Sequence, residues 1–417
     1  MNRRISRLLL GSSFALIILC FLISTPQNLL NSMQSIISHK DMLIVDYFEV
    51  GGMAGGILNA SLLIFFSTLL MNITKAPFNG LNVASIMLMG SFGLFGKNIF
   101  NVVPIIMGTY LYSLASKTPF KDTVAIALFA SCFAPFVTEL VFYTQIPLVI
   151  ALVLAMSVGF LIVPVSRHLY NVHEGFNLYN IGFGIGILST LYVSVMKSYS
   201  YAPQTQLILK TMDTPKVFIM LLVFFILMFA LGIYYDKQAL IKMKSLLKES
   251  GYKDNDFLQK YGLGTTLVNM SINGVLSLIY VVIFAKAPLN GPSIGGIFTV
   301  VGFSGLGKHA RNIIPIFLGV YLGSLTHFWN IYDTSIIFAA LFGTALAPIA
   351  GHFGFFYGVI ASMINASVVL SSGSLHAGLN LYNTGFSVGI VSGVLVPLFK
   401  IVKPSVERLR LKLFPNN

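Results

Sequence analysis

Amide and phenol side chains occur twice, in the same order, within hydrophobic parts of the chain. The two copies lie 203 positions apart. Asparagines three positions apart share one face of a helix, and their amides can replace the water shell of a small neutral polar solute. The alternative is that these groups join neighbouring helices, which contributes only about 1 kcal/mol per contact. The residues concerned are Asn177, Tyr179, Asn180, Asn380, Tyr382 and Asn383.

A second duplicated stretch begins and ends with a lysine and has no charged residue between them. The first copy starts with Lys-Ala-Pro-Phe-Asn-Gly and ends at Lys97, and the second starts with Lys-Ala-Pro-Leu-Asn-Gly and ends at Lys308. Proline suits the first turn of a helix, and Asn-Gly permits a sharp backbone change before it. A short helix starting after Asn79 or Asn290 would point unpaired N–H groups into the membrane, toward a carbonyl oxygen or an anion. The alternative is a kinked span packed through small residues.

Three ionisable side chains lie in or beside these apolar stretches. Lys97 and Lys308 could attract anions, although lysines at helix ends more often extend to the membrane surface. Glu139 lies inside an apolar segment, with His352 at the approximate counterpart position in the second half. Because carboxyl groups at membrane depth are often functional, Glu139 is a candidate for coupling transport to protons or sodium ions.

Composition defines the class of protein that carries these motifs. Hydrophobic residues make up 56% of the chain and charged residues 9%, and the mean hydropathy is +0.84. Soluble domains carry roughly 25% charged residues. The apolar runs are about 17–25 residues long, which suits helices that span a bilayer. The sequence therefore predicts an all-α polytopic membrane protein that has the lipid bilayer as a partner.

Other classes of function find little support in the sequence. The net charge of +13 would suggest nucleic acid for a soluble protein, but the basic residues cluster in loops and at the termini, where membrane orientation explains them. Cys20 and Cys132 fall in apolar runs without metal-ligand spacing. No arrangement typical of an enzyme or a nucleotide site is present. We therefore expect no nucleic-acid partner, no metal, no cofactor and no enzymatic activity.

The duplicated motifs divide the chain into two halves, 1–211 and 212–417, each with seven apolar segments. The positive-inside rule places both termini and the basic connection 237–260 in the cytoplasm. The first half then starts inside, and the matching first loop of the second half also lies inside, so the halves have opposite orientations. The sequence predicts two inverted-topology repeats, each with about five to seven transmembrane segments that include re-entrant or broken helices.

Two paths are open for the stretches 79–96 and 288–307. If they cross the membrane, more of the lysines and arginines lie on the cytoplasmic side. If they turn back, the Pro and Asn-Gly starts are easier to explain, because their backbone groups need protein or water as partners. We prefer re-entrant or broken helices at both duplicated motifs. The two Asn-Gly starts would then face one another across a pseudo-two-fold axis.

The paired motifs, spread over nearly the whole chain, resemble an uncharacterised bacterial family of polytopic membrane proteins, a domain of unknown function. A more distant resemblance is to urea transporters, whose Gly-Leu-x-Gly-Tyr-Asn element is similar to residues 175–180 and 378–383. These resemblances imply a bacterial cytoplasmic (inner) membrane, a pore of paired half-helices and a urea-like solute.

Together these observations predict a membrane transport protein, either a channel or a secondary transporter, that moves a small polar solute between the two repeats. The alternative is a membrane enzyme or a lipid-handling scaffold in which the Asn/Tyr motifs are structural glue. Channel and coupled transporter both remain open at this point, as do monomer and homo-oligomer. The predicted pathway residues are Asn79, Asn290, Asn177, Tyr179, Asn180, Asn380, Tyr382, Asn383, Lys97 and Lys308, with Glu139 as the coupling candidate.

Overall fold

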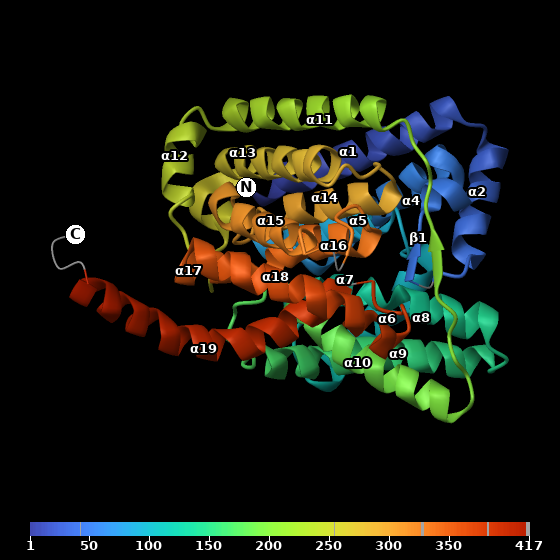
Figure 1. Cartoon of the computed structure of the whole chain (residues 1–417). Coiled ribbons are helices and arrows are strands. Elements are labelled where there is room, and N and C mark those ends of the chain that lie inside the picture. Colours follow the sequence, from blue (N-terminus) through green and yellow to red (C-terminus); the bar gives the residue numbers. More distant parts are fainter. Residues whose placement is uncertain (42, 254, 327–328, 382, 414–417) are drawn as a thin grey trace.

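The protein is a bundle of nearly parallel helices (Figure 1). Ten helices in the described part of the chain are long and apolar enough to cross a membrane. The prediction of an all-α polytopic membrane protein is therefore confirmed. Tyr382, one of the predicted pathway residues, lies outside the residues that the structure describes. This computed structural model describes residues 1–41, 43–253, 255–326, 329–381 and 383–413.

The first half of the chain contributes long helices and two shorter ones. The long segments are α1 (Asn2–Ile23), α4 (Gly52–Thr74), the interrupted segment Val124–Tyr143, α9 (Leu148–Tyr170) and α10 (Asn180–Ser198). The shorter helices are α5 (Gly80–Phe92) and α6 (Ile99–Ala115). Two further helices, α2 (Pro26–Ser38) and α3 (Tyr47–Val50), lie in the connection between α1 and α4.

The second half has the same order of long and short helices. The long segments are α11 (Thr214–Tyr235), α13 (Phe257–Ile279), the interrupted segment Thr334–Phe353, α18 (Phe355–Ser372) and α19 (Asn383–Leu413). The shorter helices are α14 (Gly291–Phe303) and α15 (Ala310–Ser324). The basic connection contains α12 (Ala239–Leu246).

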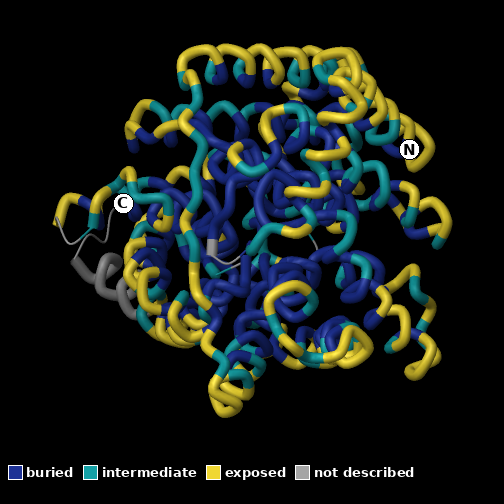
Figure 2. Tube along the Cα trace, turned by 90° about the vertical axis from the view of Figure 1, so that its right-hand side faces the viewer, coloured by how far each residue is buried: buried dark blue, intermediate teal, exposed yellow. Residues whose placement is uncertain are grey.

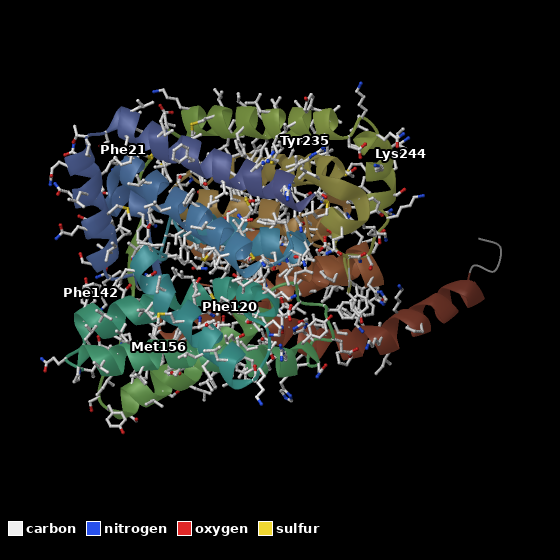
Figure 3. All side chains as sticks on the ribbon, turned by 180° about the vertical axis from the view of Figure 1, so that it is seen from behind. Phe21, Phe120, Phe142, Met156, Tyr235 and Lys244 are labelled. Atoms are coloured by element: carbon white, nitrogen blue, oxygen red, sulfur yellow. The ribbon has the colours of Figure 1, made fainter. Side chains whose placement is uncertain are left out.

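The bundle has two distinct ends along its helix axes. We call the end that carries α12 and the C-terminal part of α19 the α12 face, and the end that carries α2 and strand β1 (Leu43–Val45) the β1 face (Figure 1). Lys244 lies at the α12 face, and Phe142 lies at the β1 face (Figure 3). At the β1 face, β1 pairs in parallel with β2 (Gln206–Ile208). This pairing ties the connection between the two halves to the segment that precedes α4.

The short helices α5 and α14 form the centre of the molecule. They lie between α1, α4, α11 and α13 on one side and the lower helices of Figure 1 on the other. Nearly all residues of both helices are buried, and burial decreases outward from this centre (Figure 2). Because protein surrounds them, helices of 13 residues need not match the thickness of a bilayer.

The helices α5 and α14 run side by side in opposite directions. A Cβ atom added to Gly80 would lie 2.2 Å from the carbonyl oxygen of Gly305, and one added to Gly291 would lie 3.0 Å from the carbonyl oxygen of Leu94. The start of each short helix therefore lies beside the end of the other. The expectation that the two starts face one another is wrong, because antiparallel packing places them at opposite faces.

The stretch 79–96 does not turn back within its own length. Gly80 donates a hydrogen bond to Asp256, which precedes α13 near the α12 face, whereas Leu94 accepts one from Tyr47 beside β1. The chain therefore runs in one direction from the α12 face to the β1 face before α6 leads it back. Our preference for re-entry fits this stretch less well than the crossing path.

Interrupted helices do occur, but they lie outside the two duplicated motifs, where the sequence analysis expected them. A 3₁₀ turn, Ser131–Phe133, separates α7 (Val124–Ala130) from α8 (Ala134–Thr138). In the second half, α16 (Thr334–Leu341) and α17 (Ala347–Phe353) are separated by Phe342–Leu346. Both α8 and α17 begin with Ala-Pro. Proline lacks the N–H that would continue the preceding helix, which explains a break at this point.

Candidate functional site

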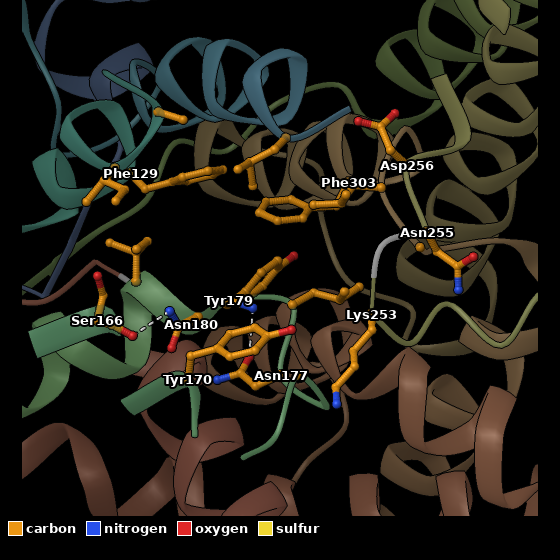
Figure 4. Close-up of a pocket in the computed structure, with 18 of the residues that line it drawn as sticks. Phe129, Ser166, Tyr170, Asn177, Tyr179, Asn180, Lys253, Asn255, Asp256 and Phe303 are labelled. Carbon is orange, nitrogen blue, oxygen red and sulfur yellow. Dashed lines mark hydrogen bonds between the residues drawn. The ribbon is translucent and has the colours of Figure 1, made fainter. Parts of the chain in front are cut away.

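A cavity of about 640 Å³ lies at the α12 face, beside the start of α5 and the end of α14. Four predicted pathway residues line it: Asn79, Asn177, Tyr179 and Asn180. The rings of Tyr179 and Phe303 lie next to each other at this cavity (Figure 4), with centroids 4.5 Å apart and ring planes tilted by 59°. The first Asn/Tyr motif and the first Asn-Gly start, which are about 100 positions apart in the sequence, thus meet at one cavity.

Asn180 is held by hydrogen bonds at both ends of its amide. Its Oδ1 lies 2.8 Å from His173 Nε2, and its Nδ2 donates to the carbonyl oxygen of Ser166 at 2.9 Å. The second of these bonds is visible in Figure 4. Asn180 therefore braces the loop before α10 against α9, although it also lines the cavity. This is the structural role that the sequence analysis gave as the alternative.

Asn383 has the same arrangement in the second half. Its Oδ1 lies 2.9 Å from His376 Nε2, and its Nδ2 donates to the carbonyl oxygen of Val369 at 3.1 Å. A histidine seven positions before each asparagine thus makes the same contact twice. The histidines were noted in the sequence only as neighbours of the motif, and the fixed spacing was the signal that could have identified the pair.

Asn177 shapes the turn that presents Tyr179. Its Oδ1 accepts a hydrogen bond from the Tyr179 N–H at 2.7 Å, and its Nδ2 donates to the carbonyl oxygen of Gly385 at 3.4 Å. Tyr179 is buried, and its hydroxyl accepts a hydrogen bond from Lys308 Nζ at 2.6 Å. The cavity wall is therefore an aromatic pair, with an ammonium group directly behind one ring.

Lys308 and Lys97 are both fully buried. Lys308 Nζ also donates to Thr344 Oγ1 at 2.7 Å and lies 4.4 Å from the centroid of the Tyr179 ring. Lys97 Nζ donates to the carbonyl oxygen of Leu128 at 3.2 Å. Neither lysine forms an ion pair with a described carboxylate. The alternative that these lysines extend to the membrane surface is therefore wrong.

The position of these lysines has an electrostatic explanation. Lys97 follows the C-terminal end of α5, and Lys308 follows that of α14. The C-terminal end of a helix carries a partial negative charge, equivalent to about half an electron. The helix ends thus compensate part of each ammonium charge, and hydroxyl, carbonyl and aromatic groups supply the remaining contacts.

The N-terminal ends of the short helices are not free, contrary to the expectation of unpaired N–H groups. The side chain of Asn79 accepts a hydrogen bond from within α5, and the side chain of Asn290 accepts one from within α14. The Gly80 N–H donates to Asp256 Oδ2 at 2.8 Å, and the Gly291 N–H donates to Asp46 Oδ2 at 3.0 Å. Each half of the chain therefore caps the short helix of the other half.

These two aspartates were missed by the sequence analysis. Asp46 is the N-cap residue of α3, and Asp256 is the N-cap residue of α13. They lie 210 positions apart, which is nearly the spacing of the lysine-bracketed stretches. Extending the internal comparison upstream would have found them.

The rim of the cavity is positively charged. Arg167 and Lys253 line it and form no ion pair with a described carboxylate. Asp256 is the carboxylate among the lining residues, and its oxygens accept backbone N–H groups at the starts of α5 and α13. Because helix N-termini offset the charge of Asp256, the local field favours polar or anionic solutes over cations.

A second pocket, toward the β1 face, is lined by Asn380 and Asn383. Its volume is only about 40 Å³. Ile44 and Phe95 close it beside β1, and the described residues that line it include no lysine, arginine, aspartate or glutamate. The corresponding motifs of the two halves thus line one open cavity and one nearly closed pocket.

Glu139 lies at neither pocket but at the β1 face. Its side chain is buried, lies 3.3 Å from Lys40 Nζ and accepts a hydrogen bond from the Tyr201 hydroxyl. It therefore lies at the opposite end of the molecule from the open cavity, although Phe129, ten residues earlier in the chain, lines that cavity. The structure does not bring Glu139 together with the Asn/Tyr motifs.

Fold and site together define the chain as a multi-pass helical membrane protein with a cavity at one end. More particularly, the chain belongs to the family described as "Protein of unknown function (DUF1576)", which matches residues 25–198 and 235–401. The expected membership of an uncharacterised family is confirmed. No curated protein and no solved structure matches the chain.

Proposed function

We propose that this protein is a secondary transporter that carries a small polar solute between the α12 face and the β1 face. The proposal depends mainly on the difference in volume between the two pockets, which is about 640 Å³ at the α12 face and about 40 Å³ at the β1 face. Because corresponding motifs line both, we interpret the two halves as inverted-topology repeats whose pockets open in turn. A channel would need both to be open at once, which makes it the weaker of the two transport hypotheses.

The solute site proposed here is the cavity at the α12 face. Asn79 supplies an amide, and Tyr179 and Phe303 supply two tilted aromatic rings. Arg167 and Lys253 attract negative charge at the rim. A urea-like solute, suggested by the distant resemblance, fits amide hydrogen bonding and aromatic stacking. Small carboxylates fit the charged rim, so both classes belong in the first panel of test solutes.

The orientation proposed here places the α12 face in the cytoplasm of a bacterium. The lysines in and around α12, among them Lys242 and Lys244, would then obey the positive-inside rule. The protein would lie in the inner membrane with both termini cytoplasmic, and the cavity would be open to the cytoplasm.

Uptake into proteoliposomes tests the proposal. Purified protein is reconstituted and supplied with radiolabelled urea, small amides, amino acids and small carboxylates, with protein-free liposomes as the control. We expect uptake of at least one class and its loss in Asn79→Ala, which removes an amide from the cavity. Absence of flux for every solute, with protein that elutes as a single peak, would overturn the proposal.

The scaffold alternative has one specific observation in its favour. The amides of Asn180 and Asn383 are both engaged in bracing contacts. Those contacts support a structural role for these two side chains, but the scaffold alternative does not explain the basic rim of the cavity beside the first of them. If Asn180→Ala lowers stability without changing flux, Asn180 is structural and the solute site rests on Asn79 and the aromatic pair.

A further inference from the structure

We propose that Asp41 and Glu139 together form a proton-binding site at the β1 face. Its coupling role rests on the transport function proposed above, whereas proton binding itself does not. Asp41 lies between α2 and β1, and Glu139 follows α8. Both residues are only 1% exposed.

Each carboxyl group has one engaged oxygen and one free one. Glu139 Oε1 contacts Lys40 and Tyr201, and Asp41 Oδ2 lies 3.4 Å from the hydroxyl of Thr138, the residue before Glu139. Glu139 Oε2 and Asp41 Oδ1 are buried and meet no hydrogen-bond donor at bonding geometry among the described residues. A buried carboxylate oxygen without a donor is costly. A proton on the carboxyl group removes that cost.

The charges around the site do not balance without a proton. Lys40 forms the ion pair with Glu139, and no other described ion pair involves either carboxyl group. The only described ion pair at the site joins Lys40 to Glu139, so an ionised Asp41 would be a buried charge without a counter-ion among the described residues. Burial raises the pKa of Asp41 well above its usual value, and we assign the proton to Asp41.

Phenol groups seal this site from the β1 face. Tyr201, from the segment after α10, bonds Glu139, and Tyr143 bonds the carbonyl oxygen of Ser38 at 2.8 Å while Lys40 lies over its ring. Tyr47 faces Asp41 from α3. The titratable groups that face the pair are thus Lys40, Tyr47, Tyr143 and Tyr201. Separation of these segments, which opening of the β1 face would require, would expose the two carboxyl groups and let the proton exchange.

The positions of the second half that correspond to Asp41 and Glu139 carry no carboxyl group. Gly251 lies 210 positions after Asp41, and His352 lies 213 positions after Glu139. Gly251 lines the open cavity. A proton site that exchanges at the β1 face makes the opening of that face respond to the pH on its own side. A metal ion is a poor alternative occupant, since no group of three His, Cys, Asp or Glu in the described chain could hold one.

The direction of the pH effect follows from the raised pKa of Asp41. The closed β1 face binds the proton more tightly than an opened, hydrated face would, so protonation stabilises the closed form. That stabilisation is complete below the ordinary aspartate pKa and is lost as the pH rises through the raised value. Rising pH therefore favours opening of the β1 face.

Infrared spectroscopy of the reconstituted protein tests proton binding directly. At neutral pH we expect a protonated-carboxyl C=O band in the wild type that is missing in Asp41→Asn. The exposed Asp122→Asn serves as the matched control and should keep the band. Glu139→Gln should also lose it, because Lys40 then has Asp41 as its partner and Asp41 ionises. Identical spectra for wild type and Asp41→Asn would overturn the site, and a band kept in Glu139→Gln would show that the two groups do not share a proton.

A pH gradient across proteoliposomes tests the coupling role. Wild-type uptake should respond to the gradient, and Asp41→Asn and Glu139→Gln should lose that response while still exchanging labelled solute at equilibrium. An unchanged gradient response in both variants would overturn coupling through this site. If the wild type moves no solute at all, the transport proposal fails, and the infrared result still decides whether the proton site exists.

Discussion

The two pockets use corresponding motifs but differ in what surrounds them. Asn177 and Asn180 line a cavity of about 640 Å³, whereas Asn380 and Asn383 line one of about 40 Å³. At the α12 face, Gly251 lines the cavity and packs against the backbone of Gly307, just after the end of α14. At the β1 face, loops carrying Asp41 and the β1–β2 pair fill the space. The comparison teaches that the duplicated motifs line a pocket at each face, while the surrounding connections differ between the large pocket and the small one.

The largest expected effect concerns the close contact between the short helices. In Gly80→Ala the new Cβ would lie 2.2 Å from a backbone oxygen, whereas in Gly291→Ala it meets the Asp46 side chain first, at 2.4 Å. A side chain can move and a packed backbone cannot, so we expect losses of about 3 and 1 kcal/mol respectively. Thermal unfolding in detergent measures both.

Gly11→Ala is the control for this pair, because nothing lies within 4 Å of the added Cβ. It should leave the unfolding temperature unchanged. If Gly291→Ala loses as much stability as Gly80→Ala, the packing around the two helix starts is equally rigid. The difference between the α12 face and the β1 face would then not extend to the ends of the short helices.

The reciprocal caps should differ in strength. Asp46 is fully buried and accepts N–H groups from Phe48, Lys210 and Gly291, whereas Asp256 is partly exposed and accepts two. We expect Asp46→Ala to cost about 2 kcal/mol and Asp256→Ala about 1 kcal/mol. Chemical or thermal unfolding of the two variants gives the order. Equal losses would mean that burial at the β1 face adds nothing to the cap.

Cysteine labelling sharpens the difference in access between the two pockets. Leu81 lines the open cavity and is 39% exposed, whereas Val369 lines the small pocket and is 3% exposed. A local opening cost of about 1.4 kcal/mol gives about tenfold protection, so Leu81→Cys should react at least that much faster than Val369→Cys. The native Cys20 and Cys132 are buried and provide the background. Equal rates would contradict a single open face.

The last comparison, between Asn180→Ala and Asn383→Ala, separates a structural role of these asparagines from a role in solute binding. Asn180→Ala removes two hydrogen bonds and Asn383→Ala removes three, and we expect each to cost about 1–2 kcal/mol of stability. Only Asn180 lines the open cavity, so the affinity for solute should fall in Asn180→Ala and remain in Asn383→Ala. Binding isotherms at a temperature where both variants are folded make the comparison. A matching loss in both would point to a stability effect alone.

The sequence predicted the class of fold because hydrophobic length is a local property. It also predicted two groups of residues that line the cavity, Asn79 and the motif at residues 177–180, because both belong to stretches that occur twice in the sequence. The antiparallel packing of α5 and α14 could not be predicted, because it depends on glycine contacts between residues more than 200 positions apart.

The sequence also could not predict which groups contact the buried charged side chains. Lys97 and Lys308 looked like surface lysines because a single sequence does not reveal that the C-terminal ends of two short helices lie inside the protein. The role of Glu139 depends on Lys40 and Tyr201, which come from two distant connections. Polar residues in connections, which carry no hydrophobic pattern, supply most of what the sequence analysis missed.

The reciprocal caps also set an order for biogenesis. The Gly80 N–H has its hydrogen-bond acceptor, Asp256, 176 residues further along the chain. At a synthesis rate of 5–20 residues per second, Asp256 is made roughly 10–35 s after Gly80. During that time the ribosome has released the first half into the bilayer with its central helix uncapped. Neither half can complete its own central helix, so the two fragments made as separate chains should accumulate only when they are synthesised together.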